Sequence, residues 1–141
     1  MFNTIVVGTD GSDTADKAVA RGAELARLTG AQLHIVSAYT PTPARVVGEK
    51  AAGEYSIGPD FKVDAVLSGT IAGLREQGLE IKSHAPKGDP ADAIIDVALR
   101  ERADLIVLGS KGMQGARRML GSIPNKVSHH SPCDLLIVQT T

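Results

Sequence analysis

Cysteine and aromatic residues are scarce in this chain of 141 residues. One cysteine, Cys133, excludes an internal disulfide bond and a zinc site built from cysteines. There is no Trp, and aromatic residues make up only 3% of the sequence. A hydrophobic core must therefore be built from Val, Ile, Leu and Ala. Binding of nucleic acid single strands, which depends on aromatic stacking, is not expected.

Long hydrophobic runs are also missing. No apolar segment approaches the ~20 residues of a membrane-spanning helix. The N-terminal residues MFNTIVVGTDGSD lack the basic start and the apolar stretch of a signal peptide. The length suits a single domain over residues 1–141. We therefore expect a cytoplasmic protein of one domain, without a membrane partner.

The charged residues are nearly balanced, with a formal net charge of −1, but they are unevenly distributed. Residues 105–133 contain no Asp or Glu and four basic residues, which are Lys111, Arg117, Arg118 and Lys126. A small positive segment in an otherwise acidic chain indicates a local anion site rather than a nucleic-acid surface.

Short apolar runs indicate five strands. Residues 80–84 alternate between apolar and polar side chains, which is typical of a strand nearer the edge of a sheet. The other four runs are typical of strands buried on both faces: residues 4–7, 32–38, 105–108 and 135–138.

Helical patterns occupy the segments between these strands. The first helix is predicted to begin near Ser12 or Asp13 and to end before Gly30, a left-handed C-cap. Another begins at Asp89-Pro90, a cap followed by proline in the first helical position. Two more cover about residues 62–77 and 122–130. The order predicts an α/β fold, an open parallel sheet of Rossmann-like type with helices on both faces.

Residues 39–61 are the exception to this alternation. They contain three prolines and three glycines and have no clear period, so we expect a long variable loop.

Glycine-rich segments follow two of the predicted strands. The first is Gly8-Thr9-Asp10-Gly11-Ser12, and the second is Gly109-Ser110-Lys111-Gly112, which continues to Gly121-Ser122 before the last helix. In a doubly wound sheet, ligands bind beyond the carboxyl ends of the strands. Glycine exposes backbone amides, and a helix N-terminus adds a partial positive charge, so both favour a phosphate. On spacing alone, a flexible loop and an anion site are equally supported.

Several known motifs are missing. The sequence has no G-x4-G-K-[ST], which excludes a P-loop NTPase, and no G-x-G-x-x-G after the first strand, which disfavours the usual dinucleotide site. It has neither the G-x-S-x-G of a hydrolase elbow nor the H-E-x-x-H of a zinc protease.

Three segments together resemble the universal stress protein family: VVGTDGSD, GDPADAIIDVALRERADLIVLGSKG and GSIPNKVSHHSPCDLLIV. The resemblance covers nearly the whole chain and is weakest in residues 39–61. It implies a five-stranded parallel sheet in the order 3-2-1-4-5 and a homodimer formed through the last strands. It also implies a regulatory protein of the stress response.

The ATP-binding branch of this family resembles G-x2-G-x9-G-[ST]. Gly109, Gly112, Gly121 and Ser122 match its fixed positions, and the spacer 113–120 is one residue shorter. That difference concerns the course of the loop rather than the existence of the site. The resemblance implies bound ATP, with Mg²⁺ carried by the nucleotide.

The same resemblance implies a role for further residues. Gly8, Thr9 and Asp10 would border the nucleotide, and Ala38 would line the adenine pocket. Leu108 and Ile123 would pack on the base or ribose. Lys111 would lie near the phosphates.

Several of these residues have a structural alternative. Asp10 contacts the nucleotide or its Mg²⁺, or closes an Asx turn. Ser122 binds a phosphate or caps the last helix. His34 is expected to be a hydrogen-bonded core residue, and Cys133 a small, partly buried filler. The pair His129-His130 is expected to complement a helix dipole rather than to bind a metal ion.

Four functions remain open at this point. The leading hypothesis is a dimeric ATP-binding regulatory protein. The others are slow ATP hydrolysis, binding of AMP or cyclic AMP in the same pocket, and a nucleotide-free dimerisation scaffold. Because no general base is evident besides Asp10, we expect ATPase activity to be weak at most.

Overall fold

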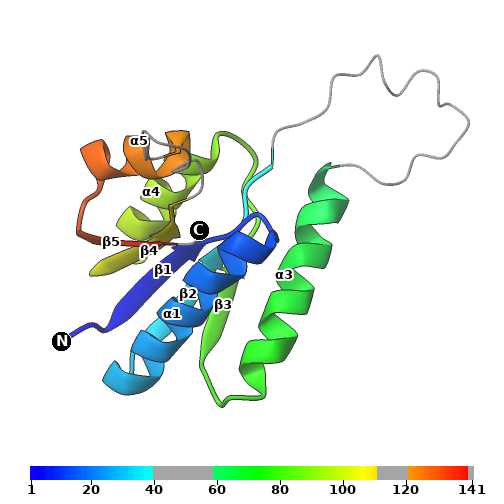
Figure 1. Ribbon diagram of the computed structural model, residues 1–141, viewed down its shortest axis with the longest axis vertical. Coiled ribbons are helices and arrows are strands. Elements are labelled where there is room, and N and C mark those ends of the chain that lie inside the picture. Colours follow the sequence, from blue (N-terminus) through cyan, green and yellow to red (C-terminus); the bar gives the residue numbers. More distant parts are fainter. Residues whose placement is uncertain (40–58, 111–120, 140–141) are drawn as a thin grey trace, which may run out of the picture.

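The computed structural model describes residues 1–39, 59–110 and 121–139, with side chains in the second helix described from Asp64 onward. Strands and helices alternate as predicted (Figure 1). No described helix has the length and hydropathy needed to cross a lipid bilayer. In chain order the elements are β1 (Thr4–Gly8), α1 (Asp13–Thr29), β2 (Gln32–Val36), α3 (Pro59–Arg75), β3 (Ile81–His84), α4 (Pro90–Arg100), β4 (Leu105–Gly109), α5 (Ser122–His130) and β5 (Asp134–Val138).

The strands form one parallel sheet in the order β3-β2-β1-β4-β5. This is the order implied by the family resemblance, and it places β3 at an edge, as predicted from its alternating pattern. Helices α1 and α3 cover one face of the sheet, whereas α4 and α5 cover the other (Figure 1). From β1 the chain continues to β2 and β3 on one side, and it then returns to place β4 and β5 on the other side. The winding therefore reverses between β1 and β4.

Successive residues of the central strands serve two separate cores. In β1, Ile5 and Val7 face α1 and α3, and Val6 faces α4 and α5. The reason is that side chains alternate between the faces of a sheet with period two. Because both faces are covered by helices, all three side chains are 0% exposed.

The predicted caps explain where two helices begin and end. Ser12 accepts a hydrogen bond from the backbone N–H of Ala15 at the start of α1, and Gly30 ends that helix with a left-handed φ of 75°. Asp89 likewise caps α4 by accepting from the N–H of Asp92. Each of these caps can be recognised from the local sequence alone.

Three boundaries differ from the prediction by two residues or more, and several strand ends differ by one. Strand β2 ends at Val36, so Ala38 lies just beyond it. Helix α3 begins at Pro59, so the last part of the predicted 39–61 loop is helical, and proline suits the first turn of a helix. The rest of that loop, residues 40–58, lies outside the described residues. Helix α3 ends at Arg75, because Gly78 follows with a left-handed φ of 79°.

Gly11 is required by both its backbone and its neighbour. Its φ is 83°, and a Cβ at this position would lie 2.7 Å from Cγ2 of Val66 on α3. We expect Gly11→Ala to lower the free energy of unfolding by about 2–4 kcal/mol, measured by urea denaturation. Gly30→Ala is the matched control, because Gly30 has a φ of 75° with nothing within 4 Å of the added Cβ. It should cost only about 1 kcal/mol. Equal losses would show that the Val66 contact adds nothing.

Candidate functional site

A cavity of about 420 Å³ lies at the carboxyl ends of β1 and β4, where the winding of the sheet reverses. This is the position at which open α/β sheets bind their ligands. Every predicted site residue that the structure describes lines this cavity, and Lys111, Gly112 and the spacer 113–120 lie outside the described residues. The predicted residues brought together here are Gly8, Thr9, Asp10, Ala38, Leu108, Gly109, Gly121, Ser122 and Ile123.

The inner wall of the cavity is apolar. Val36, Ile94 and Leu108 are between 1% and 4% exposed, and Ile123 packs against the same core. A flat, uncharged ring can pack on such a wall, whereas charged groups of a ligand must lie toward the glycines and the helix start at the rim.

Gly8 allows α4 to approach the end of β1. A Cβ at Gly8 would lie 2.7 Å from Cδ1 of Ile94 and 2.9 Å from Cδ2 of Leu108. Both of these side chains line the cavity. The absence of a side chain at Gly8 therefore determines how closely Ile94 and Leu108 approach the end of β1.

The β1–α1 loop is held by side chains that bond to its own backbone. Oγ1 of Thr9 accepts from the N–H of Gly11 at 3.1 Å, and Oδ1 of Asp10 accepts from the N–H of Ser12 at 2.9 Å. The second bond is the Asx turn that was the structural alternative for Asp10. The turn fixes the carboxylate at the rim of the cavity, which is compatible with a ligand contact as well.

The start of α5 forms the opposite rim. The interpretation of Ser122 as its cap is wrong, because Gly121 takes the N-cap position and Ser122 is the first helical residue. Glycine has no side chain with which to accept a bond, and no described side chain caps this helix. The first turn also contains no acidic residue. Its leading amides and the positive end of the helix dipole are therefore oriented to receive an anion.

Lys126 joins the two helical walls of the cavity. Its Nζ lies 3.2 Å from Oδ2 of Asp89 and 3.0 Å from Oδ1 of Asp92, both on α4. The N–H of Asp92 and, to a lesser extent, Lys126 hold the pKa of Asp89 below its usual value. Of the four basic residues in the positive segment, Lys126 is thus paired with carboxylates. Lys111, Arg117 and Arg118 lie outside the described residues.

We expect Asp89→Ala to lower the free energy of unfolding by about 1 kcal/mol at neutral pH, through loss of the α4 cap. Because the pKa of Asp89 is lowered in the folded protein, its contribution is present above the carboxyl's ordinary pKa. It is lost as the pH falls through the lowered value. Urea denaturation of both proteins across acidic pH should therefore show the difference shrinking. A constant difference would contradict this origin.

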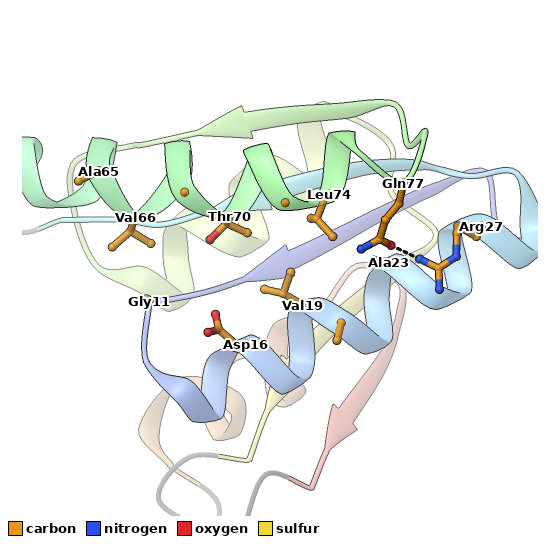
Figure 2. A pocket seen from close by; sticks show the side chains of 13 residues that line it. Gly11, Asp16, Val19, Ala23, Arg27, Ala65, Val66, Thr70, Leu74 and Gln77 are labelled. Atoms are coloured by element: carbon orange, nitrogen blue, oxygen red, sulfur yellow. Dashed lines mark hydrogen bonds between the residues drawn. The ribbon is translucent and has the colours of Figure 1, made fainter.

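A second and larger cavity, of about 580 Å³, lies between α1 and α3. Figure 2 shows Val19 and Ala23 of α1 facing Val66 and Leu74 of α3 across this groove. Arg27 and Gln77 are hydrogen-bonded at one end. The groove runs along helix flanks rather than at strand ends. Among the described residues of the two glycine-rich segments, it borders only Gly11. Its size alone does not make it the better site.

The predicted locations of His34, Cys133 and the pair His129-His130, all outside the cavity, are confirmed. His34 is 0% exposed and hydrogen-bonded within the core. Cys133 is half-buried against the core below α4, and burial raises the pKa of its thiol. His129 and His130 lie exposed in the last turn of α5.

Sequence reasoning missed part of the cavity wall. Pro90 and Ile94 come from the first turns of α4, and the remaining lining residues are Thr14, Ala15, Val36 and Pro124. The cap Asp89 predicted where α4 begins. A further signal was available, because in an alternating parallel fold helix starts share the edge of the sheet at which strands end.

A family model described as the universal stress protein family matches residues 1–139. Universal stress protein Rv1636 of Mycobacterium tuberculosis is 37% identical over 144 residues, covering 99% of this chain and 98% of the relative.

Two solved structures add ligand-bound examples. A universal stress protein in complex with cAMP is 33% identical, covers 99% of each chain and has a TM-score of 0.76. The universal stress protein from Archaeoglobus fulgidus in complex with dAMP is 25% identical, with 96% and 97% coverage and a TM-score of 0.71. The matches span the strands, the helices and both glycine-rich segments, and the chain therefore belongs to the universal stress protein family.

Proposed function

We propose that this protein binds an adenine nucleotide, ATP with Mg²⁺, in the cavity at the ends of β1 and β4. The observation that carries the proposal is the joining of an apolar wall to an uncapped helix start within one cavity. A volume of about 420 Å³ lies within the range of small-ligand pockets.

The orientation of the nucleotide follows from the chemistry of the lining. Adenine would pack between Ala38 and the apolar pair Leu108 and Ile123. The phosphates would lie toward Gly109, Gly121 and Ser122, where backbone amides and the α5 dipole are directed. Lys111 and Gly112 would complete the phosphate side, as the family pattern implies.

Isothermal titration with ATP and Mg²⁺ tests this proposal. We expect saturable heat with a stoichiometry of one nucleotide per chain, and no heat at high protein concentration would contradict it. The ultraviolet spectrum of the purified protein gives a second test. With no Trp and only two Tyr in the chain, bound adenine would dominate absorbance near 260 nm.

AMP or cyclic AMP is a second candidate for the same pocket. The observation in its favour is that two relatives, 33% and 25% identical, are in complex with cAMP and dAMP, each with one phosphate. Competition between ATP, AMP and cyclic AMP for the protein separates the two. Tighter binding of ATP would place the additional phosphates on the α5 rim, and tighter binding of cyclic AMP would favour the second candidate.

Slow ATP hydrolysis would have to depend on Asp10. It is the one acidic side chain among the described lining residues, and its Oδ1 already accepts from Ser12. Phosphoryl transfer needs a positioned water and stabilised charge on the leaving group. Any ATP hydrolysis should therefore be slow. Phosphate release by Asp10→Ala at the wild-type rate would reject a hydrolysis that depends on Asp10.

A regulatory role in the stress response would operate through a homodimer. Strand β5 lies at the edge of the sheet with Leu135, Leu136 and Ile137 half-buried, and we propose that a second copy pairs there. Sedimentation should give twice the chain mass of 14.7 kDa. A dimer that binds no nucleotide would indicate the nucleotide-free scaffold instead.

A further inference from the structure

Two histidines and a glutamate lie close together on the face of the sheet that α4 covers, and none of the three lines the cavity proposed for the nucleotide. His34 of β2 is opposite Lys82 of β3, so His84, two residues further along, lies on the same face. Glu101 follows the last residue of α4. The ligand atoms of His34, His84 and Glu101 all lie within 4.8 Å of one another.

The hydrogen bonds around His34 determine which of its nitrogens carries the proton. The amide nitrogen of Gln32 donates to Oε2 of Glu80 at 2.7 Å, because a carboxylate can only accept. Oε1 of Gln32 therefore faces Nε2 of His34 at 2.7 Å, and this ring nitrogen must be the donor. In the neutral ring, Nδ1 of His34 then holds the lone pair.

That lone pair is directed at His84. Nδ1 of His34 lies 2.9 Å from Nε2 of His84, which must supply the proton between them. If this proton moves to Nδ1 of His84, the His84 ring stays neutral. The lone pairs of His34 Nδ1 and His84 Nε2 then lie close together. Burial lowers the pKa of both imidazoles, and the nearby carboxylate of Glu101 opposes this effect.

Glu101 completes the group with a negative charge. Its side chain is half-buried, and no described side chain lies within hydrogen-bond or ion-pair distance of its carboxylate. One carboxylate beside two imidazole rings is a donor set found in protein zinc sites. Ca²⁺ and Mg²⁺ require oxygen ligands, of which this set offers one side chain.

We propose that His34, His84 and Glu101 bind a zinc-class divalent ion, with water in the fourth position. Zn–N bonds of about 2.0–2.1 Å set tetrahedral ligand atoms about 3.3 Å apart, so small side-chain rotations close the site from its present spacing. Gln32 and Glu80 orient the His34 ring from behind, as outer partners of metal-bound histidines do.

A bound ion would join β2 and β3 to the end of α4. The other end of this helix supplies Pro90 and Ile94 to the nucleotide cavity. The metal would therefore hold the helix that forms one wall of the proposed binding site.

Titration of untagged, chelator-treated protein with Co²⁺ and then Zn²⁺ tests the proposal. We expect one equivalent of Co²⁺ to give the visible bands of a tetrahedral site and Zn²⁺ to displace it. His84→Ala and Glu101→Gln should each weaken binding by about 100-fold or more, and Gln32→Ala by about 10–100-fold. Because His34 is fully buried, its removal threatens folding, and the half-buried His84 and Glu101 are the better variants.

The double variant His129→Ala, His130→Ala is the matched control, because it removes two exposed histidines. It should bind Co²⁺ as the wild type does. Absence of tetrahedral bands, unchanged binding in His84→Ala and Glu101→Gln, or loss of binding in the control would each overturn the proposal.

Discussion

Replacing Gly8 by Val should both destabilise the protein and weaken nucleotide binding. The new side chain would overlap Cδ1 of Ile94 and Cδ2 of Leu108, which lie 2.7 and 2.9 Å from the position of its Cβ. Overpacking of this kind costs about 1–3 kcal/mol in the free energy of unfolding. Because the displaced side chains line the cavity, we also expect affinity for ATP to fall by about tenfold to hundredfold, measured by isothermal titration.

Gly22→Val separates these two effects. A Cβ at Gly22 would lie 2.5 Å from Cγ2 of Val7, on the face of the sheet that α1 covers, away from the cavity. This variant should lose stability to a similar degree and keep its affinity. Equal loss of affinity in the two variants would attribute the effect to instability. Normal affinity in Gly8→Val would show that the nucleotide does not lie against this wall.

Ala38→Phe should abolish nucleotide binding with little change in stability. Ala38 is half-exposed and lines the cavity just beyond β2, so a larger side chain can extend into the open space. The phenyl ring would occupy the volume proposed for adenine, and affinity should fall by about 100-fold or more. The free energy of unfolding should change by about 0.5 kcal/mol or less, because no core contact is broken.

The α1–α3 groove supplies the control for this variant. Ala20 is exposed and lines that groove, so Ala20→Phe adds the same ring to a different cavity. It should leave ATP affinity unchanged in the same titration. If Ala20→Phe abolished binding and Ala38→Phe did not, the nucleotide would have been assigned to the wrong cavity.

The fold could be predicted from the sequence because its signals are local. Apolar runs such as residues 4–7 indicate strands covered on both faces, and the caps Ser12 and Asp89 identify the helix starts. The strand order needed the family resemblance, because alternation alone is compatible with several windings.

The parts of the site that could not be predicted depend on packing between distant segments. Ile94 reaches the cavity only because α4 packs close to Gly8. Lys126 forms ion pairs with carboxylates that precede it by more than thirty residues. Neither contact has a signal in local sequence. Of the two alternatives for Ser122, the helix cap was wrong, because Gly121, one residue earlier, adopts the extended conformation that precedes a helix.

Amide chemical shifts measured during titration with ATP and Mg²⁺ test the central claim most directly. Saturable shifts are expected at Gly8, Gly109 and Gly121, which border the cavity at the ends of β1 and β4. Gly69 and Gly73 in the α1–α3 groove should not shift. Shifts confined to Gly69 and Gly73, or none at saturating nucleotide, would contradict the account.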